Sequence, residues 1–241
     1  MKILQLISKK SQNLQEEKIP TIAFLGDSVT QGCFDIYKKS ENAIETYFDK
    51  NSAYHNYVAK IFTVLYPNVP INIINAGISG DSAPGGLKRL ERDVISYHPD
   101  LTVVCFGLND CMGGMENIDA YYSALKEIFT RLQAAGSEVI FMTANMMNTK
   151  VSCHITDTLF AEIAASSMQK QNDGVLERFF EAGKKAASEC DVKICDVYAK
   201  WKLMAKNGVD TTEILANKIN HPSESLNWLF AYSLVEVMMN D

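Results

Sequence analysis

The sequence has no cluster of basic residues, no long apolar run and no secretory signal pattern. Its 23 Lys and Arg residues against 29 Asp and Glu give a formal net charge of −6 over 241 residues. Nucleic acids and anionic membranes attract basic patches, so neither is an expected partner. No stretch approaches the roughly 20 apolar residues of a membrane-spanning helix, and lysines interrupt the short apolar start of the chain. We therefore expect a cytoplasmic protein without a membrane span.

The motifs of several common enzyme classes are also missing. The chain has no G-x-G-x-x-G, G-x-x-x-x-G-K-[ST], H-E-x-x-H or G-x-S-x-G sequence, which weighs against nucleotide enzymes, zinc proteases and standard α/β-hydrolases. The cysteines are scattered without a C-x-x-C pair or zinc spacing, at Cys33, Cys105, Cys111, Cys153, Cys190 and Cys195. We expect free thiols in a reducing compartment, no metal and no cofactor.

Short apolar runs that alternate with helical patterns predict an α/β fold. The runs are rich in β-branched and aromatic residues and have the length of buried strands, over 21–25, 71–75, 101–106, 138–144 and, more weakly, 192–197. Helical spacing predicts helices over 52–67, 85–99, 117–136, 173–190 and 223–239. Near-continuous apolarity is typical of strands covered on both faces, so a mostly parallel sheet is expected.

The chain is expected to form one domain over residues 21–241, with residues 1–20 as an N-terminal extension packed on it. No internal repeat, low-complexity tract or Pro/Gly-rich linker divides it. The least regular segment is 145–171, which is expected to be either an active-site lid or an extra helix at the surface.

Polar segments rich in glycine follow the first three apolar runs. They are "GDSVTQG" from Gly26, "NAGISGD" from Asn75 and "CFGLNDC" from Cys105. In open parallel sheets the ligand site lies beyond the carboxyl ends of the strands, so these segments should gather at one edge if the strands are neighbours. Taken alone, "GDS" is at least as typical of a turn, in which Asp or Ser can cap the next helix, as of a nucleophile.

Four motifs in order resemble the SGNH subgroup of the GDSL hydrolases, over about residues 20–240. They place Ser28 at the family's serine, Gly80 at its glycine, Asn109 at its asparagine and His221 at its histidine. The resemblance implies a three-layer α/β/α sandwich, flavodoxin-like, with a mostly parallel five-stranded sheet, and hydrolysis of an ester or thioester. It also implies that Ser28 is the nucleophile and His221 the base. The N–H groups of Ser28 and Gly80, with the Asn109 amide, would then stabilise the oxyanion.

The sequence departs from the family's D-x-x-H block, because Lys218 stands three residues before His221. A cationic amine cannot accept a hydrogen bond from the histidine ring. Three alternative partners for the ring remain: a backbone carbonyl near Lys218, which we favour, the side-chain oxygen of Asn217, or an acid such as Glu213 or Asp210.

The expected function is a serine esterase that hydrolyses a small acyl ester through an acyl-enzyme on Ser28. Deacetylation of a carbohydrate fits this description, with a small-molecule ester as the partner. One alternative is a thioesterase or lysophospholipase that acts on longer acyl chains. Another, suggested by Lys218, is a catalytically weak binding module of the same fold. A homo-oligomer is an open expectation.

Overall fold

The computed structural model describes residues 1–41 and 43–240, and its centre is a five-stranded sheet in the order β4-β1-β5-β6-β7. Each pair of neighbouring strands is parallel. The strands are β1 (Thr21–Gly26), β4 (Asn72–Gly77), β5 (Leu101–Cys105), β6 (Glu138–Thr143) and β7 (Lys193–Asp196). These are the five apolar runs of the sequence, which confirms the expected parallel α/β sheet.

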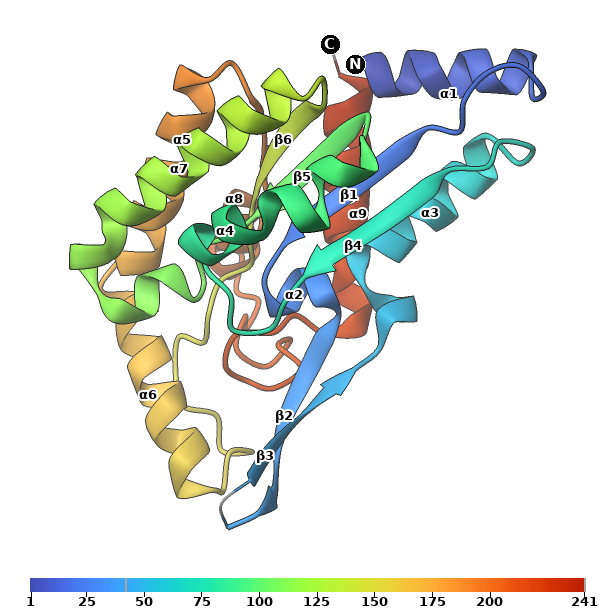
Figure 1. Ribbon diagram of the computed structural model, residues 1–241. Coiled ribbons are helices and arrows are strands. Elements are labelled where there is room, and N and C mark those ends of the chain that lie inside the picture. The colour runs from blue at the N-terminus through green and yellow to red at the C-terminus, as the bar shows by residue number, and fades with distance from the viewer. Residues whose placement is uncertain (42, 241) are drawn as a thin grey trace.

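Helices cover both faces of the sheet, so the molecule has three layers (Figure 1). One face carries α4 (Ala83–Asp93), α5 (Ile118–Ala134) and α7 (Val175–Glu189), which pack against one another. The other face carries α3 (Tyr54–Leu65) and α9 (Asn227–Met239), with α8 (Val197–Lys206) beside α9. Because β5 lies in the middle of the sheet and under helices on both sides, all five of its residues are buried. The predicted fold class is confirmed.

Several elements fall where the sequence patterns assigned no definite structure, among them a hairpin and helix α6 (Thr158–Asn172). Strands β2 (Cys33–Ser40) and β3 (Ala43–Phe48) form an antiparallel hairpin that extends away from the sheet at the lower end of Figure 1. Helix α6 occupies the second half of the irregular segment 145–171. The hairpin and α6 meet, because Lys38 Nζ lies 3.2 Å from Asp157 Oδ2 at the start of that helix.

The first residues form helix α1 (Lys2–Gln12), which lies at the end of the sheet where β6 begins. The side chains of Ile3 and Ile7 are fully buried. The backbone N–H groups of Lys2 and Ile3 donate to the Glu138 carboxylate at 2.9 and 2.8 Å. A carboxylate at a helix N-terminus is stabilised by the unpaired N–H groups there, so this contact anchors α1 to the first residue of β6.

All six cysteines are free of disulfides. Within residues 1–41 and 43–240, no helix is both long and apolar enough to cross a bilayer.

Candidate active site

The three motif segments meet at one edge of the sheet because their strands are parallel neighbours. In the register of the sheet, Gly26 at the end of β1 lies opposite Gly77 of β4 and Cys105 of β5. The segments that follow these residues therefore leave the sheet side by side. This arrangement confirms the expectation that the motifs gather at the carboxyl ends of neighbouring strands.

Ser28 begins the short helix α2 (Ser28–Gln31) directly after β1. The Asp27 side chain caps this helix by accepting a hydrogen bond from the Val29 N–H at 3.0 Å. The turn is so tight that a Cβ on Gly26 would lie 2.1 Å from Thr30 Oγ1, and one on Gly77 would lie 2.3 Å from the Gln31 nitrogen. Glycine is thus required at both strand ends for Ser28 to take its place.

The Ser28 hydroxyl contacts the imidazole of His221, which comes from the loop before α9. The distance between Ser28 Oγ and His221 Nε2 is 2.8 Å, and both residues are buried. Burial lowers the pKa of His221 to about 4, because desolvation disfavours the charged ring. The imidazole is therefore neutral at pH 7. The fold brings together two side chains that are 193 positions apart in the sequence.

The other ring nitrogen of His221 contacts the side chain of Asn217. The distance between His221 Nδ1 and Asn217 Nδ2 is 2.8 Å. Our favoured expectation, a backbone carbonyl near Lys218, was wrong, because the loop turns at Lys218 (φ 58°) and brings the residue before it to the ring. The second alternative named the right residue but the wrong atom, since the amide nitrogen and not the oxygen faces Nδ1.

The remaining candidates for a ring partner bind elsewhere. Lys218 Nζ donates to the backbone carbonyl of Glu213. The Glu213 carboxylate accepts a hydrogen bond from Ser152 at 2.8 Å, and the Asp210 carboxylate pairs with Lys150 at 2.6 Å. Neither acid is a hydrogen-bond partner of His221.

Gly80 lies between two residues that connect the three motif segments. The Ser79 N–H donates to Gln31 Oε1 of α2 at 2.7 Å, and Asn109 Nδ2 donates to the Asp81 carbonyl at 2.8 Å. Gly80 has a φ of 78°, and no atom lies within 4 Å of the position that a Cβ would take. The space on the side-chain side of Gly80 is therefore open, and its positive φ favours glycine at this position.

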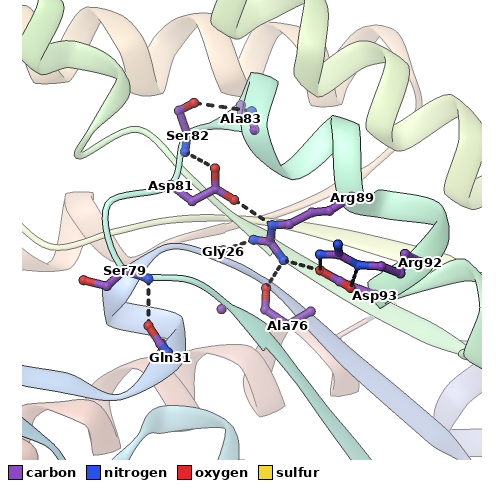
Figure 2. A network of polar contacts seen from close by, with 12 residues as sticks. Gly26, Gln31, Ala76, Ser79, Asp81, Ser82, Ala83, Arg89, Arg92 and Asp93 are labelled. Carbon is purple, nitrogen blue, oxygen red and sulfur yellow. Dashed lines mark hydrogen bonds and ion pairs between the residues drawn. The ribbon is translucent and has the colours of Figure 1, made fainter.

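Arg89 forms hydrogen bonds with the same loop, and the sequence analysis missed it (Figure 2). Its guanidinium donates to Asp81 Oδ2 at 2.7 Å and to the carbonyls of Ala76 and Gly26 at 2.6 and 3.0 Å. A weaker contact of 3.3 Å reaches Asp93. Arg89 thus links the ends of β1 and β4 to the segment that contains Gly80. The sequence feature that could have identified Arg89 is its position as a charged residue beside Leu90, on the apolar face of a predicted helix.

Two buried acids near Ser28 have raised pKa values. Burial is the main cause for Asp27, with the neighbouring charges of Asp110 and Asp81 adding to it, and its pKa rises to about 7. Burial also raises the pKa of Asp110 to about 6. Asp110 Oδ1 accepts the Ala83 N–H at 2.9 Å, but its Oδ2 is buried without a partner among the described residues. Neither acid contacts His221, so neither replaces the family's aspartate.

A cavity of about 410 Å³ lies beside the loop that carries His221. Its walls come from β2, from residues 154–157 with Phe160, and from residues 216–219. Part of the irregular segment 145–171 therefore lines this cavity. The lining combines charged side chains such as Asp35, Lys38 and Lys218 with apolar ones such as Ile36 and Phe160.

A serine in contact with a buried histidine, at the carboxyl edge of a parallel sheet, is the geometry of a serine hydrolase. Residues 24–229 match the GDSL-like lipase/acylhydrolase family, and the chain belongs to this family. The resemblance given by the four motifs is therefore confirmed, and with it the class of GDSL-type serine hydrolases at the level of the family.

Individual relatives share part of the sequence or the fold. An acetylxylan esterase from Geobacillus stearothermophilus is 26% identical over 131 residues, which span 51% of this chain and 58% of that relative. The crystal structure of the acetylxylan esterase Axe2 from the same organism superposes with a TM-score of 0.65 at 21% identity, over 92% of this chain and 95% of that one. The structure of BT4096, described as a gut microbial diltiazem-metabolizing enzyme, superposes with a TM-score of 0.65 at 20% identity, over 91% of this chain and 47% of that one. The two structural similarities show the fold.

Axe2 structures include variants of a serine, of an aspartate and of a histidine three residues after that aspartate, each described as a catalytic mutant. In the present chain the residue three before His221 is Lys218. This chain therefore lacks the aspartate at that spacing.

Proposed function

We propose that this protein is a serine esterase that removes a small acyl group, with an acetyl group on a carbohydrate as its substrate. The observation that carries the proposal is the 2.8 Å contact between Ser28 Oγ and the neutral, buried His221. Membership in the GDSL-like family supports the ester-cleaving chemistry, and the similarity to an acetylxylan esterase supports the acetylated sugar.

In this mechanism Ser28 Oγ attacks the ester carbonyl and its proton passes to His221 Nε2. The carbonyl oxygen gains the negative charge, and the N–H groups of Ser28 and Gly80 with the Asn109 amide stabilise it. When the tetrahedral intermediate collapses, the C–O bond to the alcohol breaks and His221 returns the proton to that alcohol. Water then attacks the acyl-enzyme by the same steps, which releases the acid and restores Ser28.

A cavity with polar groups beside the site is compatible with a polar carrier of the acyl group. Ser28 is only 5% exposed, so little of its surface is accessible to a substrate. The cavity beside the His221 loop contains charged and polar groups such as Asp35 and His154, which can form hydrogen bonds with the hydroxyls of a sugar, together with apolar side chains such as Phe160. Oligomeric state and cytoplasmic location remain predictions.

The test combines covalent labelling of the serine with substrate hydrolysis. Intact-protein mass after prolonged exposure to a fluorophosphonate should show one adduct on the wild type and none on Ser28→Ala. His221→Ala should label far more slowly. A matched control is Ser79→Ala, because Ser79 lies in the adjacent loop and uses only its backbone N–H in the site.

The same proteins should be given acetylated xylooligosaccharides and an octanoyl ester. The proposal predicts acetate release by the wild type and by Ser79→Ala, in preference to cleavage of the octanoyl ester. A well-folded wild type that neither labels nor releases acetate after hours of incubation would contradict it.

A further inference from the structure

The orientation of the Asn217 side chain is fixed by the backbone of its own loop. Asn217 Oδ1 lies 3.0, 2.9 and 3.0 Å from the backbone nitrogens of Ile219, Asn220 and His221. A backbone N–H can only donate, so the atom that faces all three must be the amide oxygen. Exchanging the two amide atoms would set the NH2 group against three donors and break all three hydrogen bonds.

The fixed amide determines which nitrogen of His221 carries the proton. Asn217 Nδ2 carries two hydrogens and cannot accept a hydrogen bond. One hydrogen points to Asn220 Oδ1 at 2.9 Å, and the other points to His221 Nδ1 at 2.8 Å. His221 Nδ1 must therefore accept, which means that it carries no proton. In a neutral imidazole the proton is then on Nε2, the nitrogen that faces Ser28 Oγ.

We propose that Asn217 is a positioning residue that keeps His221 in the Nε2-protonated tautomer. Acylation of Ser28 is therefore slow in the resting conformation. The proposal rests on the esterase function proposed above. Acylation requires the Ser28 proton to pass to a bare Nε2, but in this tautomer Nε2 already carries a proton. The productive tautomer bears its proton on Nδ1, where it would point at the Asn217 amide hydrogen. The imidazolium formed during catalysis meets the same conflict, so both forms need the Asn217 side chain to move away.

The structure of the loop opposes that movement. Leu215 and Pro222 form an isolated antiparallel bridge, and the Ala216 N–H donates to the His221 carbonyl at 2.8 Å. These contacts close the loop around the Asn217 side chain, which is itself buried. Release of the ring therefore requires the loop to open and not merely one side chain to rotate.

The first test reads the tautomer directly and does not depend on activity. The chain contains four histidines, and ¹⁵N–¹H spectra of histidine-labelled protein distinguish a protonated from an unprotonated ring nitrogen. The spectrum of His221→Gln identifies the His221 signals by their loss. We expect a neutral His221 ring with its proton on Nε2 in the wild type at pH 7. A proton on Nδ1 would overturn the proposal.

The second test reverses the hydrogen bond with Asn217→Asp. One carboxylate oxygen can keep the three backbone N–H bonds while the other accepts a bond from Nδ1–H. We expect the Nδ1-protonated tautomer, together with faster fluorophosphonate labelling and faster acetyl ester hydrolysis, by about 10²- to 10⁴-fold. The upper figure is the approximate loss in kcat when the aspartate of a serine-protease triad becomes asparagine.

The matched control is Asn220→Asp, which adds the same charge one contact further from the ring. A carboxylate at residue 220 can still accept the hydrogen bond from Asn217 Nδ2, so the amide and the tautomer should stay as in the wild type. Its labelling rate should therefore stay near that of the wild type. Equal acceleration by both variants would show a general effect of charge and overturn the proposal.

The outcomes separate this proposal from the proposed function. If Asn217→Asp carries the Nδ1 proton but labels no faster than the wild type, the positioning role is wrong. If it labels faster at Ser28 but neither protein cleaves acetyl esters, the positioning role stands and the substrate assignment fails. If Asn217→Asp does not fold, the tautomer of the wild type decides the question alone.

Discussion

Replacing Arg89 by methionine should both destabilise the protein and lower its kcat, because one guanidinium binds both the ends of the strands and the Gly80 segment. Methionine keeps the straight aliphatic chain but removes every donor. The carbonyls of Ala76 and Gly26 and the Asp81 carboxylate then each lose one hydrogen-bond donor at once. Arg89 itself is only 8% exposed, so water replaces the lost hydrogen bonds poorly.

The expected loss of stability follows from the burial of the ion pair between Arg89 and Asp81. Removing one partner of a buried pair costs about 3–5 kcal/mol, since the remaining charge is left without compensation. For a domain of this size each kcal/mol shifts the melting temperature by roughly 2–4 °C, so a decrease of about 6–20 °C is expected. Because Asp81 follows Gly80 and binds Asn109 through its carbonyl, kcat for an acetyl ester should fall as well.

The assay is urea unfolding and kcat, measured on the wild type, Arg89→Met and Arg92→Met. Arg92 is the matched control, because it also contacts Asp93 but its side chain is 75% exposed. Its replacement should cost at most about 1 kcal/mol. If Arg89→Met costs no more than Arg92→Met, the reasoning about the buried guanidinium is refuted.

Three further predictions concern the reaction and its pH dependence. Asn109→Ala should lower kcat for an acetyl ester by about 10²- to 10³-fold with little change in KM, as expected for a lost oxyanion donor. The acid limb of kcat/KM should lie near pH 4, because burial lowers the pKa of His221 to about 4 and the neutral ring persists to that pH. Asp27→Asn should stabilise the protein at pH 8, by on the order of 2–4 kcal/mol in urea unfolding.

The direction of the stability change in Asp27→Asn follows from the raised pKa of Asp27, which is about 7 against 3.8 in the unfolded chain. The folded state binds the Asp27 proton more tightly than the unfolded chain does. The stability that this protonation contributes is therefore fully present below pH 3.8 and is lost as the pH rises through 7. Asparagine keeps the cap on Val29 without the charge, so its advantage should grow with pH. A difference between variant and wild type that is the same at pH 4 and pH 8 would contradict this.

Each of the other two predictions has its own contradicting result. An equal change in KM with kcat intact for Asn109→Ala would assign that side chain to ground-state binding. An acid limb near pH 6.5 would mean that His221 is solvated in the free enzyme and that the closed, buried loop is not its resting form.

The strands were predictable because burial on both faces leaves a local mark. Runs such as 101–106 and 138–144 are apolar at nearly every position, and a short stretch of that kind suits a covered parallel strand. The hairpin of β2 and β3 left no such mark. Its residues "CFDIYKKS" are largely exposed in the structure, so neither alternation nor apolarity identified them as strands.

The roles of Arg89 and Asn217 could not be predicted in the same way, because they depend on partners from other parts of the fold or on loop geometry. Arg89 is defined by carbonyls at the ends of two strands, 63 and 13 positions away. Asn217 came into consideration through its position beside Lys218, but the choice between oxygen and nitrogen depends on three backbone N–H groups that a left-handed turn directs at it.

The amino-acid sequence by itself therefore determined the five strands of the central sheet, the main helices between them, the four motifs and the candidate residues Ser28, Gly80, Asn109 and His221. These are consequences of local residue type and spacing. Only the tertiary structure decided that Ser28 Oγ meets His221 Nε2, and that an amide hydrogen faces the other ring nitrogen. A hydrogen bond depends on the direction of each donor and acceptor within tenths of an ångström, and that direction is set by the packing of segments far apart in the chain.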